Sequence, residues 1–117
     1  MSDWQEIQGR FSSFDGTRIH YRRLIPKEAT CRTVILAHGF GEHTGRYGHL
    51  YERLAPLGYE FYAPDHRGHG LSEGKRGHVN KFSDYIDDLE ELRRKIDSER
   101  PNKCGLEGGN IIIGHSM

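Results

Sequence analysis

The sequence predicts an α/β fold in which an opening antiparallel hairpin precedes a mostly parallel sheet. The first observation is a pair of strand-like segments separated by Asp15-Gly16, a dipeptide typical of hairpin turns. The second is that short apolar segments then alternate with helical patterns, which favours a parallel sheet joined by right-handed crossovers. The 117 residues suffice for one small domain, without a repeat or an interdomain linker.

Five strands are expected from runs of apolar and β-branched residues bounded by turn signals. The third run, Arg32-Thr33-Val34-Ile35-Leu36-Ala37, is nearly all apolar, so we expect it to be buried on both faces. The strands are predicted over residues 4–14, 17–25, 32–37, 59–63 and 110–113.

Two crossover helices are expected, over residues 46–55 and 82–99. The second carries an apolar stripe, which we expect to face the sheet. Its members are Phe82, Tyr85, Ile86, Leu89, Leu92 and Ile96. Acidic residues lie early in this helix and basic residues late, which complements the helix dipole. We therefore interpret Asp84, Asp87 and Asp88 as part of a solvated face.

Composition and charge argue against several classes of function. The chain has 17 acidic and 17 basic residues without a long block of one sign, a pattern that does not favour nucleic acid or anionic membranes as partners. The N-terminal residues 1–6 lack a signal-peptide pattern, and no apolar run approaches the roughly 18 residues of a transmembrane segment. Cys31 and Cys104 are far apart and form no C-x-x-C motif, so we expect reduced thiols and a cytoplasmic protein.

The segment Gly114-His115-Ser116-Met117 directly follows the last predicted strand and is one residue short of a complete G-x-S-x-G. This motif forms the nucleophile elbow, a sharp turn between a strand and a helix that exposes a serine hydroxyl. Ser116 is therefore predicted to be the nucleophile of an acyl transfer reaction. The alternative is a chance G-x-S sequence at a strand end.

A complete G-x-S-x-G occurs at residues 70–74, but its context differs. Ser72 lies seven residues after Asp65, within a polar, glycine-rich loop. An elbow serine has to follow a strand directly and to open a helix. We therefore interpret Ser72 as a turn residue that hydrogen-bonds to the backbone of its own loop.

The segment His38-Gly39-Phe40-Gly41 follows the third predicted strand, and its glycines allow the backbone to approach a reacting carbonyl. An oxyanion hole combines an N–H from such a loop with the N–H of the residue after the nucleophile. We predict that Phe40 and Met117 supply these two donors. His38 is interpreted as a structural residue whose ring holds loop backbone, in preference to a catalytic base.

Two rival interpretations use the same residues. Residues 39–45 come close to a dinucleotide-binding fingerprint, with Asp65 placed where a ribose-binding acid would lie, but Thr44 replaces the third glycine. In a metal site, His66, His69, Asp65 and His78 would have to converge on zinc. Their irregular spacing favours hydrogen-bonded loop residues, and no metal or cofactor is expected.

Three segments together resemble monoglyceride lipases and lysophospholipases of the α/β-hydrolase superfamily. They are residues 38–47, with the sequence HGFGEHTGRY; residues 65–74, with DHRGHGLSEG; and the elbow at residues 114–117. The resemblance implies a serine esterase that hydrolyses monoacylglycerols or related lipid esters through an acyl-serine intermediate. It assigns Ser116 as the nucleophile and Phe40 and Met117 as oxyanion donors.

The resemblance covers almost the whole chain but only about the first half of a family member. Residues 1–117 are thus expected to form a partial α/β-hydrolase domain without the cap, the later strands, the catalytic acid and the catalytic histidine. We expect this chain alone to be inactive, with any peripheral membrane contact made through the cap. The alternatives are a nucleotide-binding βαβ module and a non-catalytic piece that folds only with a partner.

Overall fold

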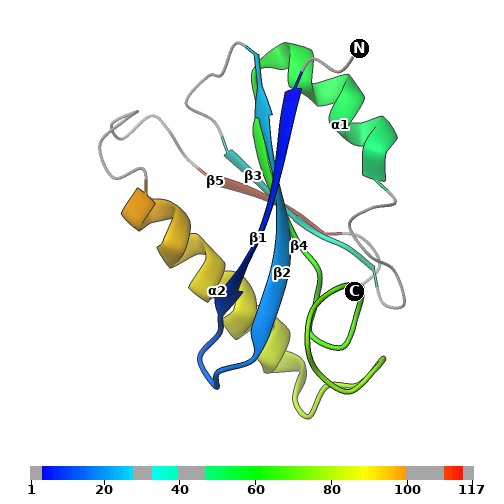
Figure 1. Cartoon of the computed structure of the whole chain (residues 1–117), viewed down its shortest axis with the longest axis vertical. Helices are drawn as coiled ribbons and strands as arrows, with labels where there is room; N and C mark the ends of the chain where they lie inside the picture. Colours follow the sequence, from blue (N-terminus) through cyan, green and yellow to red (C-terminus); the bar gives the residue numbers. More distant parts are fainter. Residues whose placement is uncertain (1–3, 28–32, 40–46, 100–109, 115–117) are drawn as a thin grey trace.

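The computed structural model describes residues 4–27, 33–39, 47–99 and 110–114. The five strands are β1 (Trp4–Ser12), β2 (Arg18–Pro26), β3 (Thr33–Ala37), β4 (Glu60–Pro64) and β5 (Asn110–Gly114). The helices are α1 (Gly48–Leu54), the short 3-10 helix η2 (Ala55–Leu57) and α2 (Phe82–Glu99). The strands form one sheet with the order β1-β2-β4-β3-β5 (Figure 1).

The pairing of the strands confirms the predicted α/β class. Strand β1 pairs antiparallel with β2, and β2 pairs antiparallel with β4. Strand β3 lies between β4 and β5 and runs parallel to both. In the predicted hairpin turn, the Ser13 N–H donates to the Thr17 carbonyl at 2.8 Å, and Gly16 has a φ of 86°. A positive φ is accessible to glycine at little cost, which explains the Asp15-Gly16 signal.

The helices cover opposite faces of the sheet (Figure 1), and each face has its own apolar cluster. Because side chains alternate along a strand, Ile35 of β3 packs in the cluster that includes Leu89 and Leu92 of α2. Val34 packs in the other cluster, which includes Tyr51 of α1. All five residues of β3 are buried, as predicted for a strand covered on both faces.

Helix α2 has the predicted bounds, but its buried face differs from the expected stripe. Phe82 and Ile86 are 58% and 51% exposed, whereas Asp88 is only 3% exposed. The placement of Asp88 on a solvated face was therefore wrong, and the stripe is narrower than predicted. The physical reason is an ion pair between Asp88 and Arg67, which lies in the loop after β4.

The other differences are small. Helix α1 spans Gly48–Leu54, and residues 55–57 continue it as the 3-10 helix η2. The predicted helix start at residue 46 lies outside the described residues. Within the part of the chain that the structure describes, we find no helix with the length and apolarity needed to cross a membrane.

Candidate active site

The candidate site lies at the edge of the sheet where the three parallel strands end. Ala37 of β3 and Gly114 of β5 are paired in register, so the segments that follow these strands begin from adjacent strand ends. The predicted nucleophile Ser116 and the predicted oxyanion donors Phe40 and Met117 lie in these segments but outside the described residues. What the structure describes is the pair of strands that precede them and the loop after the neighbouring strand β4.

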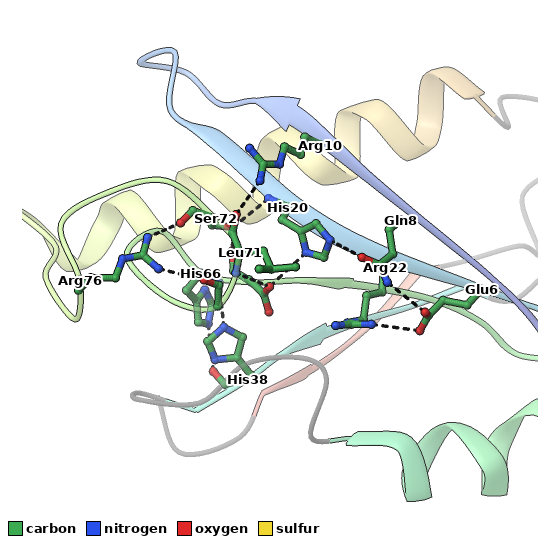
Figure 2. Close-up of polar contacts among 12 residues, drawn as sticks. Glu6, Gln8, Arg10, His20, Arg22, His38, His66, Leu71, Ser72 and Arg76 are labelled. Carbon is green, nitrogen blue, oxygen red and sulfur yellow. Dashed lines mark hydrogen bonds and ion pairs between the residues drawn. The ribbon is translucent and has the colours of Figure 1, made fainter.

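His38 and His66 join the ends of β3 and β4. The His66 backbone N–H donates to Nε2 of His38 at 2.8 Å, and the distance from His66 Nε2 to the His38 carbonyl oxygen is 3.0 Å. The two rings lie 4.3 Å apart between centroids (Figure 2). His38 is therefore held by both the backbone and the side chain of His66, in agreement with its interpretation as a structural residue.

These contacts determine where the protons of the two rings lie. Nε2 of His38 accepts a hydrogen bond, so the proton of the neutral ring is on Nδ1, which donates to the Gly39 carbonyl at 2.8 Å. His66 carries its proton on Nε2, because its partner there is a carbonyl oxygen. Burial, reinforced by the nearby His38 ring, lowers the pKa of His66 from 6.5 to about 3, so His66 is neutral at ordinary pH.

Asp65 is the first residue after β4, and its carboxylate points inward. It is 1% exposed, lies 3.2 Å from His20 Nδ1 and accepts the Leu71 N–H at 3.1 Å. A ribose-binding acid has to present its carboxylate to the ligand. The inward position of Asp65 therefore argues against the dinucleotide-binding alternative.

Ser72 has the structural role that was predicted for it. Its hydroxyl donates to the Asp65 carbonyl at 2.6 Å and accepts the His20 backbone N–H at 2.9 Å. The residue is 3% exposed. Both the donor and an acceptor position of the hydroxyl are thus used within the fold, and Ser72 is not presented to a substrate.

Arg67 connects the loop to two other elements of the fold. Its guanidinium binds both carboxylate oxygens of Asp88 in α2, at 2.8 and 2.7 Å, and both of Asp15 in the hairpin turn, at 2.8 and 3.2 Å. Ser13 adds a hydrogen bond of 2.5 Å to Asp88. These interactions hold the pKa of Asp15 below its usual range and raise that of Arg67. This network was not predicted from the sequence, and the one available signal was the position of Asp88 between the stripe residues Tyr85 and Leu92.

The remaining loop histidines also have contacts within the protein. His69 Nδ1 lies 3.1 Å from the Arg67 carbonyl oxygen, and the exposed His78 lies 3.0 Å from Asn80 Oδ1. Within residues 4–27, 33–39, 47–99 and 110–114, no three His, Cys, Asp or Glu side chains are grouped as metal ligands. Cys31 and Cys104 lie outside these ranges.

The strand order, the helices on both faces and the loops at the parallel strand ends define the chain as an α/β-hydrolase by its fold. It superposes on a thermostable carboxyl esterase from Bacillus coagulans, crystallised with glycerol, with a TM-score of 0.76 and 26% identity. That alignment covers 98% of this chain and 36% of the esterase. Residues 28–117 match the serine aminopeptidase S33 family, and the chain belongs to this family.

Two curated relatives have names that indicate a lipid substrate. The chain is 38% identical to a monoacylglycerol lipase from Mycolicibacterium smegmatis, over 92% of this chain and 36% of the lipase. It is 35% identical to the human monoglyceride lipase, over 88% of this chain and 32% of the lipase. The chain thus spans about a third of the length of these relatives, rather than the half expected from the sequence.

Proposed function

We propose that this chain is the N-terminal part of a serine hydrolase domain that cleaves carboxylic esters of the monoacylglycerol type. The observation that carries the proposal is the parallel pairing of β3 with β5, the two strands that precede Phe40 and Ser116 in the sequence. The names of the relatives support an ester substrate. The spacing of Cys31 and Cys104 supports a cytoplasmic location.

In the proposed reaction, the Ser116 hydroxyl oxygen attacks the ester carbonyl carbon and forms a tetrahedral intermediate. The N–H groups of Phe40 and Met117 stabilise the negative charge that develops on the carbonyl oxygen. The glycerol oxygen leaves with a proton, and water then cleaves the acyl-serine bond. The base that moves these protons, and the acid that orients it, follow the nucleophile in the chain order of α/β-hydrolases.

The test is a fusion protein that joins residues 1–117 to the segment following the elbow serine turn in the M. smegmatis relative. Release of fatty acid from 1-monooleoylglycerol and of nitroaniline from leucine p-nitroanilide is measured side by side. We expect ester hydrolysis that Ser116→Ala lowers by about 10³-fold or more, because the nucleophile is lost. Ser72→Ala is the matched control, since Ser72 belongs to the other G-x-S-x-G and its loss leaves the chemistry intact.

Two results would contradict the proposal. One is ester hydrolysis that survives Ser116→Ala, and the other is cleavage of the anilide in preference to the ester.

A further inference from the structure

The Gly39 carbonyl accepts a hydrogen bond of 2.8 Å from Nδ1 of His38, the residue before it. A trans peptide unit is planar, so its carbonyl and the N–H of the next residue point in opposite directions. Fixing the Gly39 carbonyl toward the His38 ring therefore fixes the plane of the peptide unit to which this carbonyl belongs.

This hydrogen bond exists only while His38 carries its proton on Nδ1. The proton is kept there by the His66 backbone N–H, which occupies Nε2 of His38 at 2.8 Å. The His66 side chain adds a second restraint, because its Nε2–H donates to the His38 carbonyl at 3.0 Å. His38 is 0% and His66 4% exposed, so water does not compete with these bonds.

His66 is itself held by its neighbour in the chain. Arg67 is fixed by two carboxylates, Asp88 of α2 and Asp15 of the hairpin turn. The His66 ring also packs against Tyr85 of α2, with 4.8 Å between the ring centroids. The loop after β4 is thus anchored on α2, and from there it holds the end of β3.

We infer that His66 is a positioning residue that orients the Phe40 N–H for the oxyanion hole, through its hydrogen bonds to His38. The inference rests on the proposed function, because that function gives the Phe40 N–H its purpose. His66 does not contact the substrate. Burial keeps its ring neutral, so the proton stays on Nε2 at any pH at which an esterase would work.

The first test observes the two rings directly, in the unmodified 117-residue chain with ¹⁵N-labelled histidine. NMR should show His38 as the Nδ1–H tautomer and His66 as the Nε2–H tautomer, with His66 unchanged between about pH 5 and pH 8. A His38 ring protonated on Nε2, or one that averages between tautomers, would overturn the inference.

The second test separates positioning from packing with two variants of His66. His66→Phe keeps an aromatic ring beside Tyr85 but removes the donor, whereas His66→Gln supplies an amide donor near the position of Nε2. His78→Phe is the matched control, because it makes the same change at an exposed histidine of the same loop. The readouts are the amide signal of Phe40 in the chain, and kcat and KM for ester hydrolysis in the fusion protein.

We expect His66→Phe to move the Phe40 amide signal and to lower kcat by about 10-fold or more, with KM within about 2-fold. His66→Gln should restore kcat to within about 3-fold of the parent, and His78→Phe should leave it unchanged. Equal losses in the Phe and Gln variants would overturn the inference, since they would indicate a packing role. If the 117-residue chain shows both expected tautomers but the fusion protein hydrolyses no ester, the proposed function is overturned instead.

Discussion

Gly68 and Gly77 lie in the same loop with similar positive φ values, 76° and 67°, yet their surroundings differ. A Cβ on Gly68 would be 2.4 Å from the Lys75 carbonyl oxygen, whereas a Cβ on Gly77 would have no atom within 4 Å. We therefore expect Gly77→Ala to cost about 1 kcal/mol for the left-handed backbone. Gly68→Ala should cost roughly 3 kcal/mol or more, because backbone also has to move. Urea unfolding of both variants measures the difference, and equal costs would contradict this account of the loop.

A second prediction at the residue scale concerns the pH dependence of stability. The pKa of His66 is about 3 in the folded protein and near 6.5 in the unfolded chain. Between these values the unfolded state binds the additional proton, so the free energy of unfolding falls as the pH falls below 6.5. The contribution is complete above pH 6.5 and has a slope of at most about 1.4 kcal/mol per pH unit.

The measurement is denaturant unfolding between about pH 5 and pH 8, compared between the parent chain and His66→Gln. All other ionisable groups are common to the two proteins, so the difference between the two curves isolates His66. We expect the Gln variant to lose less stability on acidification. Parallel curves over this range would show that His66 does not lose its proton affinity on folding.

At the scale of the element, helix α2 shows what the sequence predicts well and what it does not. Its bounds, Phe82–Glu99, and its packing on the sheet follow from a local apolar periodicity. The burial of Asp88 does not follow from this periodicity, because its partner Arg67 lies in a different element and no local pattern relates the two. The same distinction applies to the site. The sequence predicts the strands before Phe40 and Ser116, and it predicts the role of Ser72. It does not predict the hydrogen bonds between His38 and His66, because these depend on which strands become neighbours.

Two aspartates of α2 that bind arginine allow a matched prediction. Asp88 and Arg67 have side chains 4% and 10% exposed, whereas Asp97 and Arg93 are 54% and 41% exposed. Removing one partner of a buried pair leaves a charge without compensation, so Asp88→Asn should cost about 3 kcal/mol. Asp97→Asn should cost about 0.5 kcal/mol, because water screens the exposed pair. Thermal or urea unfolding compares the two variants, and similar costs would mean that Arg67 is adequately satisfied by Asp15 alone.

At the scale of the whole molecule, the sheet brings together the ends of β3 and β5, the strands that precede a proposed oxyanion donor and a proposed nucleophile in the sequence. Among the described residues, strand β5 pairs only with β3 and forms one edge of the sheet. The histidines that the structure describes at the strand ends, His38 and His66, use their rings to hold backbone. Both ring nitrogens of His38 are thus occupied by backbone groups.

The final prediction therefore compares the 117-residue chain with the fusion protein that adds the rest of the M. smegmatis relative. Without a base and its orienting acid, a serine hydrolase retains only what the oxyanion hole and substrate binding supply, a rate lower by about 10⁴-fold or more. We expect the chain alone to hydrolyse 1-monooleoylglycerol at this lower rate. The fusion protein should recover the higher rate, and Ser116→Ala in the fusion protein should abolish this recovery. Hydrolysis by the chain alone at the rate of the fusion protein, lost on His38→Gln but not on Ser72→Ala, would contradict this. It would mean that a described histidine acts as the base, and that His38 is catalytic rather than structural.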